Sequence, residues 1–334
     1  MSEAIQKAAG QRLRNILNAM TANKTVAIST GTLVTALLQS SSATTVLLIS
    51  FVNAGLISVK QSISAIMGAN IGTTLTAWLI AALGLGKFGI SSLSLPIMAI
   101  SFPLIFLKKE KVRQWGQVLI GFAILFLGLS FIKESVPDLS ANRELFEFFQ
   151  GFTYSEDQSI IYRFLIVIVT VLIGFMVTVV VQSSSAAMAL TLVLCYEGWI
   201  SFPLAAALVL GENIGTTITA NIAAVVGNVY AKRAARAHLL FNVLGVIWAV
   251  LLFPVLLQIT AFIAEAITGM DPFLVSAGIP IALAVFHTFF NVANTLVFAG
   301  FTDFLDKLVT RLVPSRSRED EAFGLDFIES GLMD

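Results

Sequence analysis

Two short polar runs interrupt long apolar stretches of this chain. Each run reads Gln-Ser-Ser-Ser-Ala, at residues 39–43 and 182–186, and each is followed at the same spacing by Gly-x-Asn-Ile-Gly-Thr-Thr, at residues 68–74 and 211–217. Serine hydroxyls and the free N–H groups at the start of a helix can bind an anion. Asparagine, threonine and carbonyl oxygens suit a hard cation. These residue types therefore indicate a site for ions.

An internal repeat relates the two pairs of motifs. Both motifs recur at one constant offset without a gap, and residues 31–77 share 20 identities in 47 positions with residues 174–220. We expect the fold to contain two related halves for this reason. One Ser/Thr cluster alone would favour helix packing, but four clusters in two matched pairs favour a shared binding site.

The composition predicts an integral membrane protein. Of the 334 residues 57% are hydrophobic and 12% are charged, and 20 basic residues balance 20 acidic ones. Soluble proteins average roughly 25% charged residues. A neutral chain of this kind does not suit nucleic-acid binding, and a single cysteine excludes an internal disulfide. Apolar stretches lie at 25–54, 61–84, 88–107, 115–133, 161–196, 201–227, 237–257 and 277–300.

The distribution of basic residues predicts the topology. The stretches 25–54 and 161–196 are longer than one crossing requires, and each carries a Gln-Ser-Ser-Ser run near its middle. If both are re-entrant hairpins with the run at the tip, and both termini are cytoplasmic, 16 of the 20 Lys and Arg residues lie inside. Six full crossings then accompany the two hairpins in a multi-pass protein of the cell membrane.

We therefore expect an all-α integral membrane protein built from two inverted-topology repeats. Each repeat should contain a re-entrant helical hairpin and a transmembrane helix broken at the glycines of the second motif. An odd number of crossings between the hairpins inverts the second half. The expected order is a cytoplasmic amphipathic segment over 1–24, repeat 1 over 25–133, an extracytoplasmic loop over 134–160, repeat 2 over 161–300 and a cytoplasmic tail over 301–334.

The placement of charge also indicates what the site must bind. In this topology no Lys or Arg falls at membrane depth. Helix ends supply only about half a charge each, so a bound oxyanion needs a co-bound cation. The residues thus favour cation-coupled anion transport, and two inverted halves can exchange conformations to give alternating access.

The paired motifs resemble those of the type II sodium/phosphate cotransporters, including their bacterial phosphate:sodium symporter relatives. The resemblance covers roughly residues 25–300, and His238, Phe241 and Asn242 are similar to that family's His-x-x-Phe-Asn element. It implies sodium-driven phosphate symport, with inorganic phosphate and sodium ions as the transported partners. It places the hairpin tips at the substrate and sodium sites, which assigns phosphate binding to Gln39, Ser40, Ser41, Ser42, Gln182, Ser183, Ser184 and Ser185. The second motifs contribute sodium ligands in Asn70, Thr73, Thr74, Asn213, Thr216 and Thr217.

The two halves differ at positions that bear on sodium. The first run continues as Thr44-Thr45 where the second has Ala-Met, so Thr44 and Thr45 offer additional oxygen ligands. Glu212 stands where the first half has Ala69 and is the only acid that the topology places at membrane depth. A buried acid is costly unless it is paired or protonated. We interpret Glu212 as a sodium ligand, with a proton carrier or a structural hydrogen bond as alternatives.

Two histidines are each followed one helical turn later by an asparagine. The pairs are His238 with Asn242 and His287 with Asn291. Hydrogen bonding between helices is the favoured interpretation of both pairs, ahead of contact with the site. Cys195 is interpreted as a packing residue.

Two other functions remain open at this point. The substrate could be sulfate or a dicarboxylate, because hydroxyl-rich tips separate these anions poorly from phosphate. A membrane enzyme would need a positioned nucleophile and base, or a metal cluster. Two separated histidines, one intramembrane acid and one cysteine do not supply these, so we expect no enzyme. A homodimer is compatible with the sequence.

Overall fold

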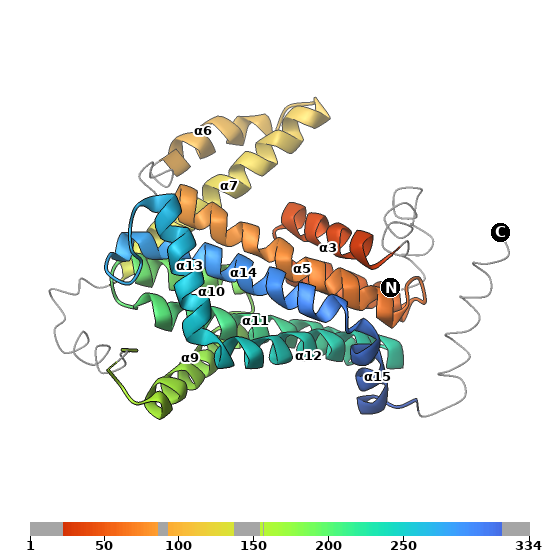
Figure 1. Cartoon of the computed structure of the whole chain (residues 1–334). Helices are drawn as coiled ribbons and strands as arrows, with labels where there is room; N and C mark the ends of the chain where they lie inside the picture. Colours follow the sequence, from red (N-terminus) through yellow and green to blue (C-terminus); the bar gives the residue numbers. More distant parts are fainter. Residues whose placement is uncertain (1–22, 86–92, 137–153, 156, 316–334) are drawn as a thin grey trace.

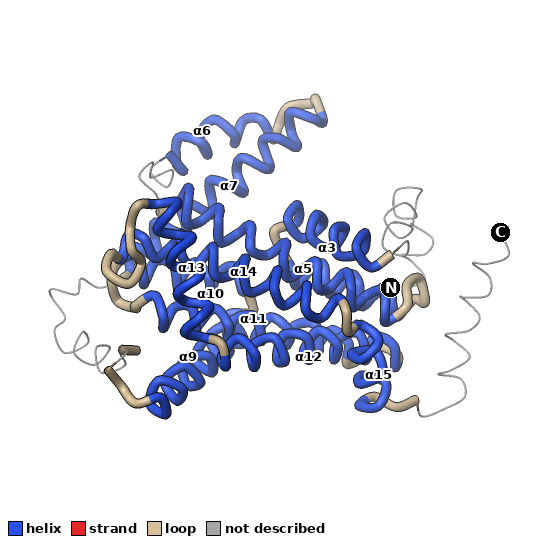
Figure 2. The backbone as a smooth tube through the Cα atoms, in the orientation of Figure 1, coloured by secondary structure: helices blue, strands red, loops and turns tan. Residues whose placement is uncertain are grey.

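The computed structural model describes residues 23–85, 93–136, 154–155 and 157–315. Every regular element in these ranges is a helix, and no strand occurs within them (Figure 2). The prediction of an all-α protein is therefore confirmed. Most of the predicted amphipathic segment 1–24, most of the loop 134–160 and the end of the tail lie outside the described residues.

The helices pack around a central group of four. The first half contains α3 (Lys24–Leu38), α4 (Ser41–Asn53), α5 (Val59–Leu79) with its π-helical extension η1 (Ile80–Gly84), α6 (Ser94–Leu104) and α7 (Glu110–Ser135). The second half contains α9 (Ile160–Val181), α10 (Ser184–Tyr196), α11 (Phe202–Ala224), α12 (Val229–Leu251), α13 (Phe253–Thr268), η3 (Ser276–Gly278), α14 (Ile279–Ala299) and α15 (Thr302–Leu312). In Figure 1, α5, α14, α11 and α12 run side by side, and the α6–α7 pair projects from one edge.

Five helices are long and apolar enough to cross a membrane. They are Val59–Gly84, Glu110–Ser135, Ile160–Val181, Val229–Leu251 and Ser276–Ala299. A chain with five such helices is a multi-pass membrane protein. One of the five is α9, the first arm of the second predicted hairpin, whereas α3, the first arm of the first hairpin, has only 15 residues.

One predicted crossing has different bounds in the structure. The sequence suggested a single segment over 237–257, but α12 ends at Leu251 and α13 begins at Phe253. Pro254 explains the break, because a proline lacks the backbone N–H that a continuous helix needs and is favoured in the first turn of a new one. The apolar stretch is thus shared by two helices.

The transmembrane helices are not broken at the second motifs, so that part of the prediction is wrong. Helices α5 and α11 run without interruption through residues 68–74 and 211–217. Their glycines instead permit close packing. A Cβ on Gly68 would lie 1.9 Å from the carbonyl oxygen of Ile28, and one on Gly211 would lie 1.9 Å from that of Val171. Small residues let membrane helices approach closely, so these glycines join α3 to α5 and α9 to α11.

The contacts of the two halves match position by position. Ile28 and Val171 occupy equivalent positions of the repeat, as do the two glycines that face them. The same holds for Gly31 and Gly174, which face the carbonyl oxygens of Ala65 and Leu208. The α3–α5 and α9–α11 crossings therefore use equivalent atoms.

We expect Gly31→Ala to lower the thermal stability of the purified protein in detergent. The added Cβ would lie 2.0 Å from the backbone oxygen of Ala65, so α3 and α5 would have to separate. Overpacking of this kind costs about 1–3 kcal/mol. The matched control is Gly121→Ala in α7, where a Cβ meets nothing within 4 Å. Equal melting temperatures for the two variants would contradict the packing role.

Candidate ion-binding site

Each Gln-Ser-Ser-Ser run forms a tight turn between two helices. Gln39 ends α3 with φ 53° and Gln182 ends α9 with φ 55°. Among the described residues these are the only non-glycine positions with positive φ. This conformation costs a residue with a side chain about 1–2 kcal/mol. The same local cost at both matched positions indicates that the shape of the two turns matters.

The serines that follow begin new helices. Ser40 and Ser183 are N-caps, and their hydroxyl oxygens accept hydrogen bonds from the backbone N–H groups of Ala43 and Ala186, both at 3.2 Å. Helices α4 and α10 therefore start at the turns and direct their positive dipole ends toward the same region. One serine in each run is thus used for capping, which leaves the later serines free for other contacts.

Both turns and both second motifs meet at one cavity. The turns contribute Ser41, Ser184 and Ser185. The remaining lining residues are Asn70, Thr73 and Thr76 from α5, Met188 from α10, Glu212, Asn213 and Thr216 from α11, and His287 from α14. Residues far apart in the sequence and from both halves of the chain therefore share a single site.

The polar side chains of the second motifs present oxygen acceptors to this cavity. The amide nitrogens of Asn70 and Asn213 donate to the carbonyl oxygens of Ile66 and Val209, at 3.0 and 2.8 Å. Each bond uses one N–H of the amide within the residue's own helix, and the side-chain oxygen can act as an acceptor. The equivalent bonds in α5 and α11 give both motifs the same orientation.

The threonine hydroxyls also donate to carbonyl oxygens of their own helices. Thr73 donates its hydroxyl proton to the carbonyl oxygen of Ala69 at 3.0 Å, and Thr216 donates to that of Asn213 at 2.7 Å. Their lone pairs are left for a ligand. A wall of oxygen acceptors is the environment that a hard cation such as sodium prefers.

Glu212 adds a negative charge to the wall. Its side chain is only 3% exposed, and the hydroxyl of Thr191 donates to one carboxylate oxygen, Oε1, at 2.7 Å. The other oxygen, Oε2, is buried without a hydrogen-bond partner. No Lys or Arg lines the cavity among the residues that the structure describes. A buried carboxyl oxygen without a protein partner needs either a bound cation or a proton.

The cavity is small in this conformation. Its volume is about 10 Å³, which is close to the space of one water molecule. A desolvated sodium ion is compatible with that space, whereas a phosphate with four oxygens is too large for it. Phosphate could therefore enter only if the lining rearranges.

Nine of the predicted site residues do not line the cavity: Gln39, Ser40, Ser42, Thr44, Thr45, Thr74, Gln182, Ser183 and Thr217. Thr44 accepts a hydrogen bond from Thr35 at 3.0 Å, and Thr45 is buried with its hydroxyl unpartnered. Thr74 and Thr217 donate to carbonyl oxygens in their own helices. Their roles in binding remain predictions.

Three lining residues were not assigned to the site from the sequence: Thr76, Met188 and His287. Thr76 could have been found, because Thr219 stands at the equivalent position of the second half and extends the repeated motif. His287 lies 3.4 Å from the amide oxygen of Asn213 through its Nε2 atom. That contact is the interhelix hydrogen bond expected for this histidine, and it also places the ring at the cavity.

The two turns are not held equally. Thr76 donates its hydroxyl proton to the side-chain oxygen of Gln39 at 3.0 Å, which connects the first turn to α5. Gln182, the equivalent residue of the second turn, has an exposed side chain. The first turn is therefore attached more firmly to its neighbouring helix than the second.

Comparison with known proteins places the chain in a family. A family model described as Na+/Pi-cotransporter matches residues 1–134 and 149–286. The "Uncharacterized protein YqeW" of Bacillus subtilis is 32% identical over 286 residues, which is 84% of this chain and 82% of the relative. No solved structure shows a significant match.

Two further relatives carry functional names. The "Putative inorganic phosphate export protein YjbB" of Escherichia coli is 31% identical over 303 residues, and this chain spans half of its length. The "Sodium-dependent phosphate transport protein 2A" of Oryctolagus cuniculus is 41% identical over 88 residues, or 26% of this chain and 14% of the relative. The family is one of transporters, not of enzymes. The chain belongs to the Na+/Pi-cotransporter family.

Proposed function

We propose that this protein is a sodium-coupled inorganic phosphate symporter of the cell membrane that works by alternating access. The observation that carries the proposal is the meeting of both repeated motif pairs at one cavity. Serines at helix starts and acceptor oxygens on neighbouring helices form its wall, so an anion and a cation can bind side by side. The family to which the chain belongs supports the same pairing of ions.

Phosphate binds, in this proposal, between the two turns. Ser41, Ser184 and Ser185 offer hydroxyl donors, and the first turns of α4 and α10 offer backbone N–H groups. Because the cavity is too small for phosphate, we expect loading to involve a movement of one turn away from the other. The second turn is the better candidate for that motion, since Gln182 lacks the contact that Gln39 makes with Thr76.

Sodium binds at the acceptor wall formed by Asn70, Thr73, Asn213, Thr216 and Glu212. Together with phosphate, the ionised carboxylate of Glu212 would place several negative charges in a space without a basic side chain. Sodium ions neutralise this charge, and moving a loaded site without them would be costly in the membrane. This coupling of charge makes phosphate transport depend on sodium.

The two halves act as inverted repeats with re-entrant turns. In Figure 1, α5 and α11 run in opposite directions along the central group, as inverted halves require. The starts of α3, α5 and α12 gather at the end of the molecule where α14 ends and α15 begins, and their basic residues Lys24, Lys60 and Arg233 all contact that region. By the positive-inside rule this end is cytoplasmic, which supports cytoplasmic termini.

A sodium gradient should drive phosphate uptake into proteoliposomes. We expect radiolabelled phosphate to accumulate above its equilibrium level with an inward sodium gradient and only to equilibrate with a matched potassium gradient, because the anion site needs sodium for charge balance. Equal accumulation in the two gradients would reject coupling to sodium. Excess unlabelled sulfate or dicarboxylate in the same assay tests the substrate: unchanged uptake would support phosphate, whereas strong competition would shift the substrate assignment to that anion.

Phosphate export is the second candidate direction, favoured by the name of the YjbB relative. Preloaded vesicles with an outward sodium gradient test it. A reversible symporter releases phosphate under that gradient. Phosphate release at the same rate with and without the sodium gradient would support a separate export mechanism.

Glu212→Gln should weaken the dependence of transport on sodium. Losing a charged hydrogen-bonding partner costs about 1.5–3 kcal/mol, so the sodium concentration for half-maximal activation should rise on the order of tenfold or more. The measurement is initial phosphate uptake against sodium concentration. The matched control is Glu197→Gln. The Glu197 carboxylate forms an ion pair with Lys133, with 3.2 Å between Nζ and Oε1, and Glu197 does not line the cavity. An unchanged sodium curve for Glu212→Gln would remove Glu212 from the sodium site.

Ser41→Ala should weaken phosphate binding more than Ser42→Ala. The two serines are neighbours on α4, but only Ser41 lines the cavity. Loss of a hydrogen bond to a charged group costs about 1.5–3 kcal/mol, which predicts a KM for phosphate raised roughly tenfold or more by Ser41→Ala. Equal effects of the two substitutions would show that the phosphate does not contact Ser41 in the way proposed.

A further inference from the structure

Helix α15 lies where a membrane-spanning helix reaches the surface. It starts at Thr302, directly after the span that ends at Ala299. Its buried face packs Leu305 and Val309 into a core cluster with residues of α5 and α12. Helix α15 is therefore fixed beside the end of the helix bundle.

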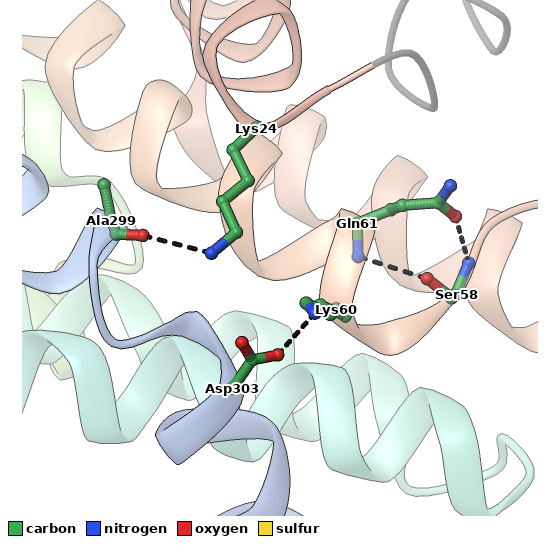
Figure 3. Close-up of polar contacts among 6 residues, drawn as sticks. All are labelled: Lys24, Ser58, Lys60, Gln61, Ala299 and Asp303. Atoms are coloured by element: carbon green, nitrogen blue, oxygen red, sulfur yellow. Dashed lines mark hydrogen bonds and ion pairs between the residues drawn. The ribbon is translucent and has the colours of Figure 1, made fainter.

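Polar contacts fix its orientation. Asp303 forms an ion pair with Lys60 at the start of α5, and the backbone oxygen of Ala299 accepts a hydrogen bond from Lys24 at 3.5 Å (Figure 3). Arg233 of α12 donates from Nε to the carbonyl oxygen of Val313 at 3.0 Å. The hydrogen bond from Lys60 lowers the pKa of Asp303, so this carboxylate stays ionised and paired. Contacts at both of its ends determine which face of α15 points away from the protein.

An apolar stripe runs along a face that the protein does not cover. Phe301, Phe304 and Leu312 are 56%, 53% and 57% exposed, and half-buried Leu308 lies between the last two. Spacings of three and four residues align these side chains on one helix face. Leu296 and Val297, on the last turn of α14 just before the stripe, are exposed as well. Exposed apolar residues on a membrane-spanning helix face lipid.

Two basic residues border the stripe. Lys307 and Arg311 are exposed and one turn apart, and each lies three residues from a member of the stripe. Apolar residues beside Lys and Arg are typical of helices that lie in the interface of a membrane with anionic lipids.

We propose that α15 is an interfacial membrane helix at the end of the bundle where α5 and α12 begin. The stripe of Phe301, Phe304, Leu308 and Leu312 enters the boundary between headgroups and acyl chains, and Lys307 and Arg311 contact anionic headgroups. The lipid bilayer is the occupant because the stripe directly follows the exposed apolar end of a membrane-spanning helix and is bordered by basic residues. This inference does not depend on which ions the protein transports.

The test uses one fluorescent label at a time on the full chain in vesicles. Phe304→Cys lies on the stripe, and Thr310→Cys, also exposed, lies off it. Both are made in a Cys195→Ala background and labelled with an environment-sensitive dye. Vesicles of phosphatidylcholine with phosphatidylglycerol carry either a nitroxide on the upper acyl chain or iodide in the aqueous phase.

The label at position 304 should be quenched by the acyl nitroxide and shielded from iodide, and the label at 310 should show the reverse. Equal iodide quenching at both positions would overturn the proposal. Shielding of position 304 from both quenchers would also overturn it, because another protein segment or a second copy would then cover the stripe.

A second comparison tests the role of the basic pair. Replacing phosphatidylglycerol by phosphatidylcholine should reduce nitroxide quenching at position 304. Lys307→Gln combined with Arg311→Gln should cause the same loss in anionic vesicles. If nitroxide quenching at position 304 stays the same after the lipid replacement and after the double substitution, the contact with anionic headgroups is rejected.

Discussion

Polar groups inside a membrane must find partners within the protein, and this constraint shapes the whole site. Asn70, Thr73, Asn213 and Thr216 use their donor groups on carbonyl oxygens of their own helices. Each of these side chains still has an oxygen that can accept from or coordinate a ligand. The turns present the opposite character, since helix starts offer N–H donors. Donors and acceptors thus face one cavity from different elements, which is the arrangement that a pair of opposite ions needs.

The repeated backbone supports unequal chemistry in its two halves. Equivalent glycines join α3 to α5 and α9 to α11, and equivalent glutamines adopt the same rare backbone conformation. Only the second half carries Glu212, and only the first half shows the contact from Thr76 to its glutamine. A carrier that exchanges two conformations need not have two identical halves. Under the proposed function, these differences would set which half binds a cation more tightly and which turn moves more easily.

Much of the fold and the site follows from local sequence. The repeated motifs predicted that Ser41, Ser184, Asn70 and Asn213 share a site, and the structure places all four at one cavity. The glycines were misinterpreted, because a glycine that frees a helix to unwind and a glycine that lets a neighbour approach look alike in sequence. The bounds of α12 and α13 also escaped prediction, since apolar content alone does not show that Pro254 begins a second helix.

The sequence by itself determined that this is a helical membrane protein, and its repeated polar motifs predicted a site for ions. Composition and repetition carry that information, because they reflect the cost of placing polar groups in lipid. Only the tertiary structure decided which hydroxyls reach the cavity and which cap helices or bond to their own backbone. It also brought His287 of α14 to Asn213 of α11. Such contacts depend on how helices that are far apart in the sequence pack together, and a local pattern of residues does not predict that packing.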